Sequence, residues 1–148
     1  MSVQRSNSAF ALSLKVGLFG TIVAIIAMLI DHAGNNSVAA HATEVYTPHG
    51  LDPNSGLIWS ILYTVFALTA IAFAVALVGA RRERLWARWW GSAAGIVSGL
   101  SLAYIAVATE YDSPILPQSW RIVSGALAAV CFVIMVTAWL PSSTKAMR

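Results

Sequence analysis

The chain has 148 residues, of which 58% are hydrophobic and only 10% are charged, and its formal net charge is +3. A soluble domain has about 25% charged residues, so this composition excludes a water-soluble globular protein and indicates an integral membrane protein. The only cysteine, Cys131, excludes an intramolecular disulfide.

Four apolar segments are long enough to cross a membrane, since a spanning helix needs about 20 mostly apolar residues. Pro141 follows the fourth segment and is expected to end it, because proline cannot continue the helical hydrogen bonds. We therefore predict an all-α membrane protein, a four-transmembrane-helix bundle that forms a single domain over residues 1–148. The predicted spans are residues 9–30, 57–80, 89–109 and 122–140.

The charged residues predict the orientation of these spans. Eight of the nine basic residues lie in the N-terminal region, in segment 81–88 or in the C-terminal tail, whereas five of the six acidic residues lie in segments 31–56 and 110–121. The positive-inside rule then places both termini and segment 81–88 in the cytoplasm and the two acidic loops outside. The basic residues are thus explained by topology and contact with anionic lipid, and no nucleic acid partner is predicted. Abundant Ala and Arg with few Lys suit a GC-rich bacterial genome, so the expected location is a bacterial inner (plasma) membrane.

Small residues recur at every fourth position of the third predicted span. Such a ridge lets helix backbones approach closely, which drives helix association in lipid. Two interpretations are open: the ridge closes the bundle internally, or it docks another subunit or a second copy of the chain. The ridge residues are Gly91, Gly95, Gly99 and Ala103.

The first outer loop, residues 31–56, holds all three histidines. Its 26 residues exceed the usual length of a structureless connection, and segment 37–45 favours a short helix with Ser37 as its N-cap, so we expect the loop to be partly ordered. Imidazole and carboxylate groups are normal ligands of Zn or Cu, although the spacing matches no established metal motif. The candidate metal ligands are His32, His41, Glu44 and His49.

Ionisable residues inside the predicted spans are limited to Lys15. This disfavours an ion-coupled transporter, which carries charge through such groups, and a haem held by two histidines within the membrane. Uncharged polar side chains also occur on the second and third spans. We expect them either to bridge neighbouring helices or to line a lipid or quinone pocket. The candidate pocket residues are Tyr63, Thr64, Ser101 and Tyr104.

The outline, with a long first outer loop and a short second one, resembles the tetraspan plan of claudin-like proteins. Those proteins carry a Trp-rich signature and a cysteine pair in the first outer loop, and residues 31–56 contain neither Trp nor Cys, so the resemblance is confined to topology. Catalytic motifs are also missing. The leading hypothesis is a non-catalytic accessory or assembly subunit of a larger membrane complex, such as a respiratory or oxygenase-type assembly. The alternatives are an extracytoplasmic metal-binding or redox protein and a lipid or quinone binder.

Overall fold

A computed structural model describes the backbone of residues 6–140 and the side chains of residues 9–140. Pro141 and the basic residues Arg5, Lys145 and Arg148 lie outside the described residues, as do the two chain termini. The described elements are, in chain order, α1 (Ser6–Ala33), α2 (Ser37–Tyr46), the 3-10 helix η1 (Thr47–His49), α3 (Ser55–Arg81), α4 (Trp86–Val107), β1 (Thr109–Glu110), β2 (Ser113–Pro114) and α5 (Gln118–Ala138).

Four of these helices, α1, α3, α4 and α5, are long and apolar enough to cross a membrane, which confirms the predicted number of long apolar helices. Their ends differ from the predicted ends. Helix α4 begins at Trp86 and α5 at Gln118, because arginine, glutamine and serine continue a helix although they interrupt an apolar run. Even the shortest, α5, has 21 residues, or about 31 Å at 1.5 Å per residue, which matches the hydrocarbon core of a bilayer.

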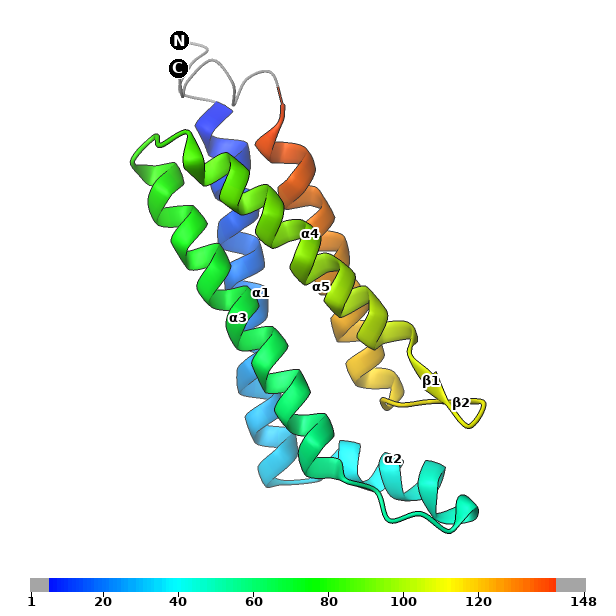
Figure 1. Ribbon diagram of the computed structural model, residues 1–148. Coiled ribbons are helices and arrows are strands. Elements are labelled where there is room, and N and C mark those ends of the chain that lie inside the picture. Colours follow the sequence, from blue (N-terminus) through cyan, green and yellow to red (C-terminus); the bar gives the residue numbers. More distant parts are fainter. Residues whose placement is uncertain (1–5, 141–148) are drawn as a thin grey trace.

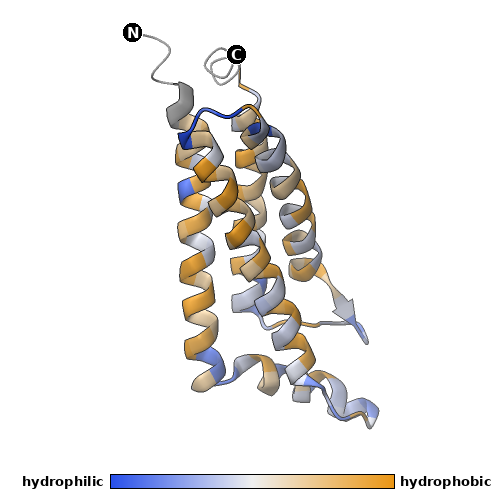
Figure 2. Cartoon of the chain, turned by 60° about the vertical axis from the view of Figure 1, so that its left-hand side comes forward, coloured by the Kyte–Doolittle hydropathy of each residue, from blue (hydrophilic) through white to orange (hydrophobic). Residues whose placement is uncertain are grey.

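The long helices form a closed ring in which α1 and α4 each pack against both α3 and α5. One end of the bundle holds the start of α1, the end of α5 and the α3–α4 connection, and we call it the loop end (Figure 1). The opposite end holds α2 and the β1–β2 hairpin. Hydrophilic residues concentrate at the two ends, whereas hydrophobic ones surround the helices between them (Figure 2).

The outside of the ring is as apolar as its inside. Buried aromatic side chains such as Phe10, Phe66 and Phe73 fill the interior, yet Phe19 is 70% exposed and Leu100 is 68% exposed. A soluble protein does not expose a continuous apolar surface of this extent. Lipid is the solvent that suits it, and the bundle therefore suggests a membrane-integral protein.

The small-residue ridge of α4 faces inward over most of its length. A Cβ atom at Gly91 would lie 2.7 Å from Cζ of Phe10 on α1, and one at Gly95 would lie 3.0 Å from the backbone oxygen of Cys131 on α5. Gly99 also packs against Cys131, whereas Ala103, the last residue of the ridge, is exposed. Contacts within the chain thus occupy the three glycines and leave no room there for another subunit.

Two short elements at the end opposite the loop end were incompletely predicted. Helix α2 forms within the first loop as expected, but its N-cap is Asn36 and not Ser37, so the predicted cap was one residue too late. Strands β1 and β2 form an antiparallel hairpin that the sequence analysis missed. Its two turn residues, Tyr111 and Asp112, both have positive φ (51° and 60°), as a type I′ turn requires.

Candidate functional site

The histidine in the last turn of α1, His32, contacts two aromatic residues of α3. The ring of His32 stacks on Trp59 with 4.6 Å between centroids and an interplanar angle of 10°. Its Nδ1 atom lies 3.2 Å from the hydroxyl of Tyr63. His32 therefore joins α1 to α3 through its ring face and its ring nitrogen.

The other two histidines contact the β1–β2 hairpin. His41 Nε2 lies 2.9 Å from the backbone oxygen of Pro114, and because a carbonyl only accepts, Nε2 carries the proton. His41 Nδ1 lies 3.9 Å from Glu44 Oε2, one turn further along α2. His49 stacks on Tyr111 with 4.4 Å between ring centroids.

The four residues predicted as metal ligands are thus not gathered around a common point. Among them only His41 and Glu44 are close to each other, while His32 and His49 have separate aromatic partners. Within residues 6–140, no group of three His, Cys, Asp or Glu side chains is placed to hold a metal ion. Metal binding stays a prediction, which elemental analysis of the purified chain tests.

Asp31, near the end of α1, anchors the elements that cover this end of the bundle. Its carboxylate accepts hydrogen bonds from the backbone N–H of Ser37 at 3.0 Å, from the Ser37 hydroxyl at 2.5 Å and from Trp120 Nε1 at 2.8 Å. Asn36 Oδ1 accepts from Trp59 Nε1 at 2.8 Å. Hydrogen bonds to a charged group are stronger than neutral ones, and this set connects α2 to three helices of the bundle.

Contacts between the first loop and the hairpin join them into one structure, which we call the cap (α2, η1, β1 and β2). The Tyr46 hydroxyl donates to Glu110, and the Tyr46 ring meets the edge of Tyr111 at 5.8 Å between centroids. His41 and His49 add the two contacts described above. The cap and the adjoining loop present exposed carboxylates, namely Glu44, Asp52, Glu110 and Asp112.

The Tyr46–Glu110 contact has a pH signature. The hydrogen bond to Glu110 and, secondarily, partial burial raise the pKa of Tyr46 from 10.0 to about 12. In the unfolded chain this phenol ionises near pH 10, so its contribution to stability is present below pH 10 and is lost as the pH rises from 10 to 12. Tyrosinate absorbance of wild type minus Tyr46→Phe should titrate with a midpoint near 12. A midpoint at 10 would show that the contact does not form.

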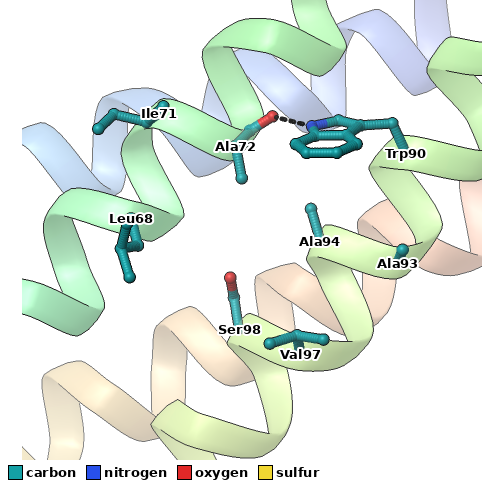
Figure 3. Close-up of a pocket in the computed structure, with 8 residues that line it drawn as sticks. All are labelled: Leu68, Ile71, Ala72, Trp90, Ala93, Ala94, Val97 and Ser98. Atoms are coloured by element: carbon teal, nitrogen blue, oxygen red, sulfur yellow. Dashed lines mark hydrogen bonds between the residues drawn. The ribbon is translucent and has the colours of Figure 1, made fainter.

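A groove between α3 and α4 forms the second candidate site. It has a volume of about 440 Å³ and lies on the side of the bundle, where its lining residues project from both helices (Figure 3). Trp90 reaches across from α4 and donates its indole N–H to the backbone oxygen of Ala72 at 3.0 Å. The lining residues are Leu68, Ile71, Ala72, Trp90, Ala93, Ala94, Val97 and Ser98.

The two polar side chains in this groove are both hydrogen-bonded within the protein, and Ser98 is buried. Trp90 Nε1 bonds to Ala72, and Ser98 Oγ accepts a hydrogen bond from Thr69 Oγ1 at 3.0 Å. The lining therefore offers a ligand only apolar contact. The groove was not predicted from the sequence, because its lining residues are one tryptophan and mostly alanines and other apolar residues, which carry no polar pattern.

The predicted pocket residues do not line one cavity together. Tyr104 lines a smaller cavity of about 120 Å³ further along the α3–α4 seam. Tyr63 points to His32, Thr64 is exposed and Ser101 is half-buried. The structure therefore brings only one of the four residues to a cavity between α3 and α4.

At the loop end, Arg88 is buried, whereas the three arginines that precede it in the sequence are exposed. Arg88 is only 4% exposed; its Nε donates to the backbone oxygen of Ala138 at 2.8 Å, and its guanidinium lies 4.9 Å from the centroid of the Trp139 ring. A cation at a helix C-terminus is favourable, so Arg88 caps α5. Arg81, the last residue of α3, and Arg82 and Arg84, on the connection between α3 and α4, are all exposed.

No protein-family model, curated protein or solved structure matches this chain.

Proposed function

We propose that this protein is a non-catalytic accessory or assembly subunit of a larger membrane complex, and that the cap is its main contact with partner subunits. The observation that carries the proposal is the construction of the cap. Two loops distant in sequence are fastened to each other and to the bundle, yet within the described residues no three of their His, Asp or Glu side chains gather at one point as a metal site would require. A cap that is ordered but holds no cluster of reactive side chains is better suited to binding another protein than to catalysis.

The charge pattern supports an orientation for this subunit. The loop end carries three exposed arginines, Arg81, Arg82 and Arg84, whereas the exposed carboxylates lie at the cap. The positive-inside rule favours a cytoplasmic loop end, with both termini on that side, and an extracytoplasmic cap. In a bacterial cell this membrane is the inner membrane.

The surface chemistry of the cap favours a basic partner. Glu44 and Asp52 are both exposed, and no lysine or arginine lies between positions 31 and 56. A cap already ordered by its own contacts loses little conformational entropy on binding, which favours specific association. The partner is an extracytoplasmic, positively charged region of a larger subunit, in a respiratory or oxygenase-type assembly.

Co-purification tests this proposal. The tagged chain, extracted from its native membranes in mild detergent, should retain larger subunits in fixed stoichiometry. Charge reversal by Glu44→Lys with Asp52→Lys should lower their recovery about tenfold or more, because like charges at an interface repel. The charge-preserving pair Glu44→Asp and Asp52→Glu serves as the control. A pure, stable monomer from the same membranes would contradict the proposal, as would full recovery with the reversed pair.

A further inference from the structure

We propose that the α3–α4 groove and the arginine-rich connection at the loop end together bind one phospholipid with an anionic headgroup. The arginines hold the headgroup, and the groove holds an acyl chain. This site is distinct from the cap and does not depend on the accessory role proposed above.

The groove has the chemistry of an acyl-chain site. Its volume of about 440 Å³ falls in the range of about 300–1,000 Å³ typical of small-molecule sites. The Trp90 N–H donates to Ala72, and Ser98 is buried with its oxygen accepting from Thr69, so the surface that faces a ligand is almost entirely apolar. A quinone headgroup, whose carbonyl oxygens seek donors, gains nothing here, whereas a hydrocarbon chain gains contact along both helices (Figure 3).

An apolar stripe connects the groove to the loop end. Leu68 and Ile71 line the groove, and Val75 and Val78 continue the same face of α3 toward Arg81; all four side chains are exposed. The rise from Leu68 to Arg81 is about 20 Å at 1.5 Å per residue. This is about half the thickness of a bilayer with its headgroups, so one lipid of one leaflet reaches from the arginines to the bottom of the groove.

Charge complementarity identifies the headgroup. The connection joins the same two helices that form the groove. Arg81 at the end of α3 and Arg82 and Arg84 on the connection are exposed, with one acidic neighbour, Glu83. Each basic residue near an anionic headgroup increases binding by about fivefold. A zwitterionic lipid with the same chains fills the groove equally well but gains little from the arginines.

The test is native mass spectrometry of the delipidated full chain, titrated with phosphatidylglycerol or with phosphatidylcholine of identical acyl chains. We expect one tightly bound phosphatidylglycerol. Replacing Arg81, Arg82 and Arg84 by Gln should weaken it by on the order of 100-fold and remove the preference over phosphatidylcholine, whereas Lys15→Gln, which removes an exposed charge on α1, should change neither.

Filling the groove tests the position of the chain. Ala94→Leu places a larger side chain in the groove and should weaken both lipids, whereas Ala129→Leu, at an exposed position of α5, should weaken neither. If Ala94→Leu does not fold, Leu68→Trp, at a 61% exposed position, fills the same space. Equal binding of the two lipids by the wild type would overturn the proposal. Unchanged lipid binding by a folded groove variant would also overturn it. So would a lipid-free dimer of the wild type that the groove variant abolishes, because the groove would then be a self-association surface.

Discussion

Replacing Gly95 by leucine should lower the free energy of unfolding by about 3 kcal/mol or more, a large effect for a single substitution. Even a Cβ atom at this position would lie 3.0 Å from the backbone oxygen of Cys131, and the rest of a leucine side chain has no space between α4 and α5. Since a backbone oxygen cannot rotate away as a side chain does, the two helices must separate. Unfolding in mixed micelles, followed by circular dichroism, measures the loss.

The same ridge supplies the matched control. Ala103 lies about two helical turns beyond Gly95 on α4 and is exposed. Ala103→Leu therefore adds similar bulk on the lipid-facing surface, and it should change the free energy of unfolding by less than about 0.5 kcal/mol. If the two variants were equally stable, the glycine ridge would not set the distance between α4 and α5, and the internal packing described here would be wrong.

Replacing Trp59 by alanine should cost about 3–5 kcal/mol, the usual range for truncating a buried tryptophan. This side chain is 2% exposed, stacks on His32, meets the edge of Trp120 and donates to Asn36. Its loss leaves a cavity where the cap joins the bundle. We therefore expect faster proteolysis within residues 34–54 as well as a lower free energy of unfolding.

The variant Trp59→Phe separates packing from hydrogen bonding at this position. Phenylalanine keeps an aromatic face for His32 but leaves Asn36 Oδ1 without its donor, so the expected cost is only about 1 kcal/mol. Trp89→Ala, which truncates a 63% exposed tryptophan at the loop end, should leave proteolysis of the cap unchanged. An unaltered digestion pattern for Trp59→Ala would show that the cap does not depend on this anchor.

The sequence was sufficient to predict the four long helices, because the length of an apolar run decides whether a helix can cross a bilayer. It did not indicate where those helices end. Gln118 and Ser119 begin α5 four residues before the predicted start, since Pro117 ends the preceding loop and polar residues are tolerated in the first turn of a helix. The spacing of the small residues indicated a ridge on α4, but only the structure shows that the ridge meets Phe10 and Cys131.

The arrangement of the candidate sites depends on contacts between distant residues, which no local pattern reveals. His41 bonds to Pro114, which is 73 positions away in the sequence, so the spacing of the histidines carried no information about their partners. The hairpin was missed because its turn, Tyr111–Asp112, lacks the Asn-Gly or Asp-Gly pair that usually marks a type I′ turn. The α3–α4 groove was missed because alanines that line a groove read the same as alanines that face lipid.

Accessibility labelling tests most directly whether the cap and the α3–α4 connection lie on opposite sides of a membrane. Thr43 of the cap and Arg84 of the connection are both exposed, and the native Cys131 is only 1% exposed. In intact cells, a membrane-impermeant maleimide should label Thr43→Cys at once and Arg84→Cys only after permeabilisation, with Cys131 unlabelled in both. Labelling of both introduced cysteines from the same side would contradict four crossings and the proposals that depend on them.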